Sequence, residues 1–320
     1  MKNEALTINE IFENRSKYIK EVGQQLETKK VQEVDINGEK LKVDYREVSV
    51  GEKEDHLKDP VIVLPGFGSG WEGIAELGFS LACEGRKVIL PSLPGYGNSQ
   101  NPSEKYYNTD NFDNEAEVIR QLIEKLDLGD KKVHLVGHSM GSEILATLAQ
   151  KYPEKIASLV LLNPAGVNED ENAVKLSTKF ILSGVQTNAE FHAKSFFSGE
   201  KDYEKDLYAH ISKPESPFNK ERITQRLAEA KKVSKGQLLE KIKKIDLPIT
   251  YITGELDTVY PPGKENDKNS QLAQIISSVN DKENIRVSVM KKLRHNTTLA
   301  PDEITAANID HYLEVAEKRN

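Results

Sequence analysis

Residues 133–141 read Val-His-Leu-Val-Gly-His-Ser-Met-Gly, an apolar run that leads into the pattern Gly-x-Ser-x-Gly, and a helix-like stretch follows from Ser142 to Lys151. A strand that turns sharply into a helix can hold a serine exposed beside a base, which a serine hydroxyl needs in order to act as a nucleophile. Small residues must let the two backbones approach, and Gly137 and Gly141 meet that need. Ser139 is therefore a candidate nucleophile, and an inert turn serine is the alternative.

Short apolar runs recur along the chain, with helical stretches between most of them. Unbroken runs of this kind indicate strands that are buried on both faces, and their alternation with helices predicts a doubly wound, mostly parallel α/β sheet. A hairpin around Asn37-Gly38 precedes them, because both residues suit a type I′ turn. The hairpin strands and the apolar runs together predict an eight-stranded sheet: Val31 to Ile36, Leu41 to Val50, Val61 to Leu64, Lys87 to Leu90, Val133 to Val136, Leu159 to Leu162, Ile249 to Ile252 and Ile285 to Met290.

Two segments fall outside this alternation. Residues from about Asn9 to Lys30 read as a charged amphipathic helix, which we interpret as an N-terminal appendage. From about Asn168 to Lys244 helical patterns replace the strands, which predicts an inserted helical domain. This insertion is rich in aromatic residues, Phe180 and Phe196 among them, which form its own core or face a pocket.

Composition limits the classes of function. The 320 residues carry 44 Lys and Arg against 51 Asp and Glu, a formal net charge of -7, and the charges are scattered, so nucleic acid is not an expected partner. The N-terminus lacks the apolar core of a signal peptide and no run approaches a membrane span, so we expect a soluble, cytoplasmic protein. Cys83 is the single cysteine, which excludes an internal disulfide framework and a Cys-rich metal site.

A nucleophilic serine needs a base and a group that orients the base. His295 follows the last predicted strand, and a loop histidine at the carboxyl edge of a sheet can reach over that sheet. Asp257 follows the strand Ile249 to Ile252 at the same edge, where ligand crevices form in open α/β sheets. Glu255 is the alternative carboxylate in this loop. We expect Ser139, Asp257 and His295 to form a catalytic triad.

Attack on a carbonyl also needs hydrogen-bond donors for the oxyanion that forms. Leu64-Pro65-Gly66-Phe67-Gly68 follows the first buried strand, so the backbone N–H of Phe67 can join that of Met140 in bracketing Ser139. Gly66 and Gly68 are then expected beside the substrate. Trp71, just beyond this loop, is either a core anchor or a substrate contact.

With these features in place, the chain resembles the α/β-hydrolase fold family from about Val31 to its C-terminus. The order Ser139, Asp257, His295 is that of the family. Two further landmarks are similar: Leu93-Pro94-Gly95-Tyr96-Gly97-Asn98-Ser99 after a strand, and Leu148-Ala149-Gln150-Lys151-Tyr152-Pro153 before one. The resemblance implies an α/β core of residues 31–166 and 246–320, preceded by the appendage of residues 1–30 and interrupted by a helical cap of residues 167–245. Pro65, Ser92 and Ser142 depart from the family pattern, which blurs the subfamily.

The expected reaction is hydrolysis of a carboxylic ester through an acyl-enzyme on Ser139, and it requires no metal and no organic cofactor. The expected small-molecule substrate carries a small or medium apolar acyl or aryl group. An ester is favoured over an amide because an alcohol leaving group needs only modest protonation by His295. A carbon–carbon bond hydrolase of the same fold and a non-catalytic ligand-binding protein are the alternatives. No feature of the sequence indicates an oligomeric state.

Overall fold

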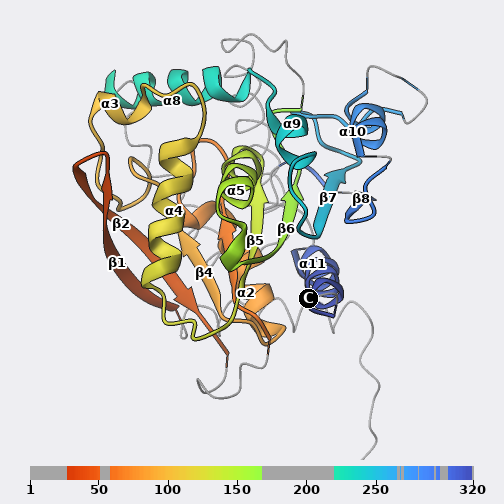
Figure 1. Ribbon diagram of the computed structural model, residues 1–320, viewed down its shortest axis with the longest axis horizontal. Helices are drawn as coiled ribbons and strands as arrows, with labels where there is room; N and C mark the ends of the chain where they lie inside the picture. Colours follow the sequence, from red (N-terminus) through yellow and green to blue (C-terminus); the bar gives the residue numbers. More distant parts are fainter. Residues whose placement is uncertain are drawn as a thin grey trace, which may run out of the picture.

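The computed structural model describes residues 27–50, 58–167, 220–264, 267, 270–279, 281–291, 293–295 and 302–318. Its centre is one eight-stranded sheet in the order β1-β2-β4-β3-β5-β6-β7-β8, with helices on both faces (Figure 1). The β1–β2 and β2–β4 pairs are antiparallel, and all other neighbouring strands are parallel. The predicted eight-stranded, mostly parallel sheet is confirmed.

The elements have the following bounds. The strands are β1 Glu27–Ile36, β2 Glu39–Val48, β3 Val61–Leu64, β4 Val88–Pro91, β5 Val133–His138, β6 Ile156–Leu162, β7 Ile249–Gly254 and β8 Ile285–Met290. The helices are η2 Trp71–Ile74, α2 Ala75–Cys83, α3 Glu104–Tyr107, α4 Asp113–Lys125, α5 Met140–Lys151, η3 Pro153–Lys155, α8 Lys220–Val233, α9 Leu238–Ile242, α10 Gln271–Val279 and α11 Asp302–Glu317.

The central strands are apolar throughout because both of their faces are covered. In β3, Ile62 and Leu64 belong to the core that α4 and α5 cover, whereas Val61 and Val63 belong to the core that α2 and α11 cover. All four side chains are fully buried. A strand placed between two helical layers has no face left for polar residues. The unbroken apolar runs in the sequence follow from this arrangement.

The register of the parallel strands brings their carboxyl ends to one edge. Leu64 pairs with Gly137, His138 pairs with Leu162, and Gly254 pairs with Met290. Leu162 also pairs with Ile252 on the next strand. The segments that follow β3, β5, β6, β7 and β8 therefore begin side by side, which places the predicted site residues at a common edge.

Two sequence predictions about the sheet are wrong in part. Residues 27–30, predicted as the end of a helix, belong to β1, because Glu27 to Ile36 pair in register with β2. Strand β8, predicted to be buried on both faces, is only partly buried, and Val289 is 44% exposed. The cause is its place at the edge of the sheet, with a neighbour on one side only. The predicted hairpin turn is confirmed, with φ of 54° at Asn37 and 85° at Gly38.

Part of the predicted appendage and insertion lies outside the described residues. Residues 1–26 and 168–219 are not described, so Phe180, Phe196 and most of the predicted N-terminal helix fall outside the structure. From the interval 167–245, α8 and α9 are described, and both are helical as the sequence predicts. The division into core, appendage and cap stays a prediction.

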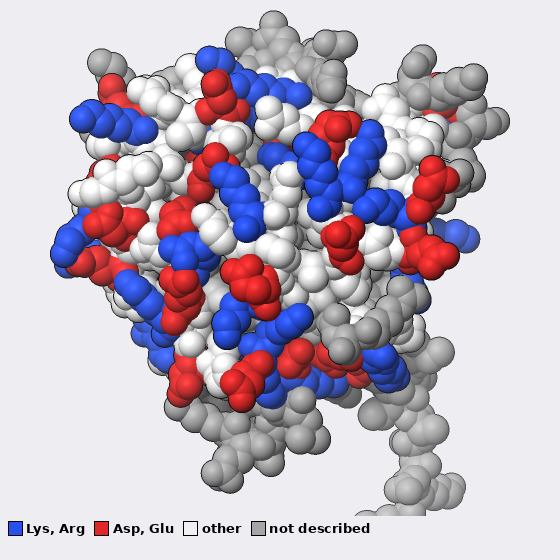
Figure 2. Space-filling view, viewed as in Figure 1, with Lys and Arg blue, Asp and Glu red and all other residues white. Residues whose placement is uncertain are grey.

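Charges of both signs are mixed on the surface. Figure 2 shows Lys and Arg interspersed with Asp and Glu over the face that carries α4, α5 and α8. This distribution agrees with the scattered charge of the sequence. Among the described residues, no helix has both the length and the hydrophobicity that crossing a bilayer requires.

Candidate active site

Ser139 occupies a strained turn between β5 and α5. Its φ is 51° and its ψ is -119°, a conformation that residues with a side chain rarely adopt. A Cβ on Gly137 would lie 2.6 Å from Cα of Ser142, and a Cβ on Gly141 would lie 2.6 Å from the carbonyl oxygens of Leu64 and Pro65. Only glycine fits at both positions, so the two glycines of the motif permit the sharp turn that presents the serine.

The structure brings Ser139, His295 and Asp257 together. His295 Nε2 lies 3.0 Å from Ser139 Oγ, and His295 Nδ1 lies 2.8 Å from Asp257 Oδ2. All three residues are buried. They come from the loops after β5, β8 and β7, which are far apart in the sequence and meet at the carboxyl edge of the sheet.

Asp257 is held as an ionised acceptor. Burial alone would raise its pKa, but the contact with His295 and the backbone N–H groups of Val259 and Tyr260 outweigh burial, so the pKa of Asp257 lies below its ordinary value. The two amides donate to Oδ1 at 2.8 Å each, which leaves Oδ2 for His295. A carboxylate there favours the tautomer with its proton on Nδ1, so that Nε2 can accept the serine proton. Glu255, the alternative, is exposed.

Two further residues fix the loop of His295, and no sequence pattern predicts this role for either of them. His138 Nε2 donates to the carbonyl oxygen of His295 at 2.6 Å. Burial, together with the nearby His295, lowers the pKa of His138 to about 3, which keeps its ring neutral. Asn163, at φ 44°, donates to the carbonyl of Arg294 at 2.7 Å and accepts the Gly254 N–H at 2.7 Å. The elbow and the ends of β6 and β7 are thereby tied to the loop of His295.

The loop after β3 lies against the elbow. Because Leu64 pairs with Gly137, the residues from Pro65 onward run beside Ser139. A Cβ on Gly66 would lie 2.8 Å from Ser139 Cβ and 3.1 Å from His138 Nδ1. Met140 is the first residue of α5, and the first amides of a helix have no acceptor within it. This placement is compatible with Phe67 and Met140 as oxyanion donors, a role that stays a prediction.

The Gly66→Ala substitution is expected to lower activity without unfolding the protein. The added methyl must displace Ser139 or the loop, and a shift of about 1 Å in a reacting group can cost about 100-fold in rate. Steady-state hydrolysis of an ester and a thermal unfolding curve would measure the two effects separately. Gly129→Ala is the control, because Gly129 has φ of 57° and open space around it and is exposed. That variant should lose stability and keep its kcat; the same kcat in both variants would contradict the prediction.

Trp71 lies at the start of η2 and packs against the core that α2 and α11 cover. The Arg46 guanidinium lies 4.4 Å from the centre of its ring. Its backbone N–H donates to Ser92 Oγ at 3.0 Å, which gives a structural use to the serine that departs from the family pattern. These contacts favour the core-anchor interpretation of Trp71.

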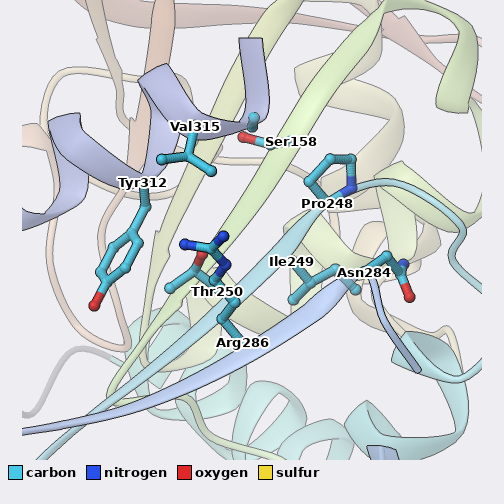
Figure 3. A pocket seen from close by; sticks show the side chains of 9 residues that line it. Ser158, Pro248, Ile249, Thr250, Asn284, Arg286, Tyr312 and Val315 are labelled. Carbon is cyan, nitrogen blue, oxygen red and sulfur yellow. The ribbon is translucent and has the colours of Figure 1, made fainter. Parts of the chain in front are cut away.

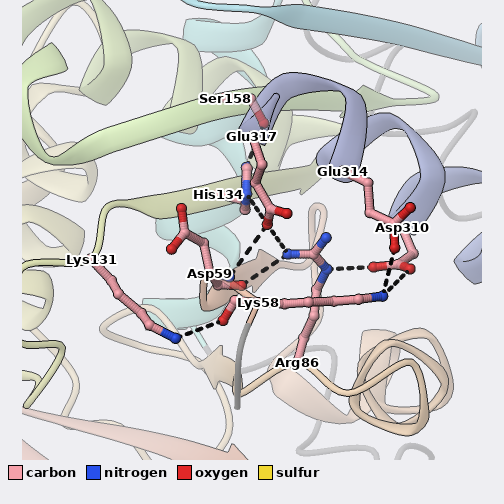
Figure 4. Close-up of polar contacts among 9 residues, drawn as sticks. All are labelled: Lys58, Asp59, Arg86, Lys131, His134, Ser158, Asp310, Glu314 and Glu317. Carbon is pink, nitrogen blue, oxygen red and sulfur yellow. Dashed lines mark hydrogen bonds and ion pairs between the residues drawn. The ribbon is translucent and has the colours of Figure 1, made fainter. Parts of the chain in front are cut away.

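A polar cluster at the opposite edge of the sheet offers ligand atoms but does not suit a metal. Asp59, His134 and Glu317 place one ligand atom each within 4.8 Å of the others. The guanidinium of Arg86 already occupies this place, since its Nη1 donates to Glu317 Oε1 at 2.6 Å and to the carbonyl of Asp59 at 3.0 Å (Figure 4). A second cation there would face a buried positive charge. We assign the cluster to the attachment of α11.

A groove also lies away from Ser139. Ser158, Thr250 and Arg286 from the amino-terminal halves of β6, β7 and β8 line it together with Tyr312 of α11 (Figure 3). Ser158 donates to or accepts from His134 Nδ1 at 2.7 Å, and His134 Nε2 lies 3.0 Å from Glu317 Oε1. Ser158 lies within an extended strand, so this second serine–histidine–carboxylate arrangement lacks the sharp turn that presents a nucleophile.

Comparisons with known proteins identify the family. Residues 59–288 match the profile described as alpha/beta hydrolase fold. 1-acylglycerol-3-phosphate O-acyltransferase ABHD5 of Sus scrofa is 35% identical over 118 residues, which cover 35% of this chain and 31% of that protein. The chain thus spans about a third of the length of these ABHD5 relatives.

Two further proteins match over a larger share of their length. Lipase 3 of Moraxella sp. (strain TA144) is 26% identical over 225 residues, 66% of each chain. A thermophilic esterase of Thermogutta terrifontis is similar in structure, with a TM-score of 0.62 and 17% identity over 91% of this chain and 98% of that one. The profile match covers most of the chain, and the chain belongs to the α/β-hydrolase fold family.

Proposed function

We propose that the protein is a serine hydrolase that cleaves carboxylic esters with a small or medium apolar acyl or aryl group. The observation that carries the proposal is the hydrogen-bonded chain from Asp257 Oδ2 through His295 to Ser139 Oγ, with separations of 2.8 and 3.0 Å. The strained turn at Ser139 supports its role as nucleophile. The names of two relatives, a lipase and an esterase, support an ester as the substrate.

The proposed reaction has two halves. His295 Nε2 takes the hydroxyl proton of Ser139 while Oγ attacks the ester carbonyl, and the backbone N–H groups of Phe67 and Met140 stabilise the oxyanion. His295 then delivers the proton to the departing alcohol, which leaves an acyl group on Ser139. Water attacks this acyl-enzyme, gives its proton to His295 and releases the carboxylic acid, and Ser139 recovers its proton. Asp257 stabilises the imidazolium in both halves.

Labelling with a fluorophosphonate probe tests the nucleophile directly. The probe should label the wild-type protein and not Ser139→Ala. Ser158→Ala is the matched control, because Ser158 also contacts a histidine, at 2.7 Å, but lies within a strand. This control should label as the wild type does. Labelling that survives Ser139→Ala and disappears in Ser158→Ala would reverse the assignment.

Hydrolysis of p-nitrophenyl esters of increasing chain length would then define the acyl group. A short or medium optimum supports the proposed substrate class, and a long optimum would replace it with a lipase-like one. Labelling without turnover of any simple ester would favour the carbon–carbon hydrolase. Neither labelling nor turnover would favour the ligand-binding alternative.

A further inference from the structure

Tyr96 connects the loop of Phe67 to α8. It lies in the loop after β4 and is 4% exposed. Its hydroxyl accepts a hydrogen bond from the Gly68 backbone N–H at 3.4 Å and donates one to Glu229 Oε2 on α8. Since Gly68 follows Phe67, the tyrosine hydroxyl contacts the peptide unit that joins these two residues. One side chain thus links the predicted oxyanion loop to a helix that is distant in the sequence, since Tyr96 and Glu229 are 133 positions apart.

The residues around Tyr96 are shaped to receive α8. Gly95 has φ of 84°, and a Cβ there would lie 2.7 Å from Gln225 Oε1 and 2.6 Å from Tyr107 Oη. Gln225 in turn donates to Glu229 Oε1 at 3.2 Å. Both carboxyl oxygens of Glu229 therefore have a hydrogen-bond partner. Gly95 provides the space for one of these partners, the side chain of Gln225.

The loop after β4 makes a second contact at its first residue, Ser92. Ser92 Oγ accepts the Trp71 N–H at 3.0 Å, and a Cβ on Gly97 would lie 2.8 Å from that oxygen. The loop after β4 thus holds the loop after β3 at two points. Of these two contacts, that of Tyr96 is the nearer in sequence to Phe67, which supplies the predicted oxyanion donor.

The buried carboxyl of Glu229 is not explained by a contribution to the stability of the fold. It is 1% exposed, and burial raises its pKa to about 7 although hydrogen bonds from Tyr96 and Gln225 favour the ionised form. Burying a carboxyl costs free energy that its partners offset only in part, and strongly perturbed carboxyls concentrate at functional sites. The titratable groups that face it are Tyr96, Lys232 on α8, Glu115 on α4 and Tyr106 on α3.

We propose that Tyr96 and Glu229 are positioning residues for the oxyanion loop. Glu229 accepts the hydroxyl hydrogen of Tyr96, which turns a lone pair of the hydroxyl oxygen toward the Gly68 amide and fixes the peptide after Phe67. This proposal rests on the proposed esterase function. Because α8 lies in the interval predicted as the cap, it also means that a helix of the insertion determines how well the oxyanion is stabilised.

Tyr96→Phe and Glu229→Met test the proposal through their effect on the transition state. Each should lower kcat for a p-nitrophenyl ester by about tenfold, less than the loss of a direct oxyanion donor, and should change KM by less than about twofold. A trifluoromethyl ketone inhibitor places an oxyanion in the same position, so its Ki should rise by the factor by which kcat/KM falls. The double variant should be no slower than the slower single variant, because the two residues act as one unit.

Two controls separate positioning from folding. Tyr106 is 3% exposed, and its hydroxyl has no hydrogen-bond partner among the described residues. Tyr106→Phe removes only this hydroxyl, so kcat should not change. Glu229→Met removes a buried carboxyl but leaves the Tyr96 hydroxyl and the Gln225 amide without their acceptor, so its unfolding temperature should fall by a few degrees, and kcat is measured well below that temperature. A loss of activity that appears only near the unfolding temperature would overturn the proposal.

The remaining outcomes are distinguishable. If the wild type hydrolyses esters and Tyr96→Phe does so equally well, or if only its KM rises, the positioning role is wrong and the esterase proposal stands. Additive losses in the double variant would likewise overturn the shared role of Tyr96 and Glu229. A wild type that neither labels nor hydrolyses esters would overturn the proposed function and the positioning role with it.

Discussion

The Ser139→Ala variant is expected to lose about 10⁴- to 10⁶-fold in kcat, because no acyl-enzyme can form without the serine hydroxyl. Alanine replaces serine at the same φ of 51° without adding atoms, so the strain of the turn is unchanged. Circular dichroism and the unfolding temperature should therefore match those of the wild type. The measurement is kcat on the best p-nitrophenyl ester.

His295 and Asp257 should act with Ser139 as one catalytic unit, so their substitutions should not have additive effects. His295→Ala should cost about as much as Ser139→Ala, and the double variant should be no slower than either, because residues that act as a unit are not additive. Asp257→Asn should lower kcat by about 10⁴-fold, since an amide no longer selects the tautomer with its proton on Nδ1. His311→Ala is the control, because His311 is exposed on α11. An active Ser139→Ala, or additive losses, would contradict the assignment.

The proximity of Ser139, Asp257 and His295 was predictable because each of them follows a strand that the sequence identifies. Strands β3 and β8 have the predicted bounds, and β5 and β7 begin where predicted. In a parallel sheet the carboxyl ends meet at one edge, so a serine, an aspartate and a histidine after three such strands are brought together by topology alone. The fold and the placement of Ser139, Asp257 and His295 follow from this rule.

The supporting residues were not predictable by the same rule. His138 and Asn163 bind the backbone carbonyls of His295 and Arg294, and these contacts depend on the path of a loop that no periodic pattern describes. An asparagine directly after β6, before Pro164, was the one local signal for Asn163. For His138 the sequence offers no such signal apart from its position next to Ser139.

Buried ion pairs were also hidden from the sequence. Lys232 and Glu115 are separated by 117 positions and form a pair at 2.9 Å in which each side chain is 2% exposed. Lys241 and Glu143 form another buried pair at 2.8 Å. Helical periodicity identifies the polar face of a helix but not the neighbouring helix that covers it, so no sequence pattern marks these charges as buried.

Arg86→Ala is expected to lower the free energy of unfolding by about 3–5 kcal/mol, because it removes the buried cation between Asp310 and Glu317 and leaves them with Lys58 and His134 alone. The Arg86 side chain is fully buried; its Nε donates to Asp310 and its Nη1 donates to Glu317 Oε1 at 2.6 Å, which attaches α11 to the rest of the domain (Figure 4). Urea unfolding would measure the loss. Arg120→Ala is the matched control: Arg120 also pairs with two carboxylates, Glu117 and Glu124, but it is partly exposed.

Arg120→Ala should lower the free energy of unfolding by no more than about 1 kcal/mol, because water screens an exposed ion pair and solvates the carboxylates that lose their partner. Equal losses in Arg86→Ala and Arg120→Ala would mean that burial does not set the strength of the Arg86 network. A loss in Arg120→Ala that exceeds the loss in Arg86→Ala would contradict the prediction outright.

Acid should weaken the same attachment in a defined range of pH. Burial alone would raise the pKa of Glu317, but hydrogen bonds from His134 and Arg86, with the Arg86 charge, lower it from its ordinary value of 4.5 to about 2. A carboxyl whose pKa is lower in the folded chain stabilises the fold above its unfolded pKa and loses that contribution as pH falls through the folded one. The urea midpoint of the wild type should therefore fall between about pH 4.5 and pH 2. Glu317→Gln should be less stable at neutral pH and should lose less over this range, because its amide has no proton to gain. An equal loss in both proteins would show that other carboxyls carry the acid sensitivity.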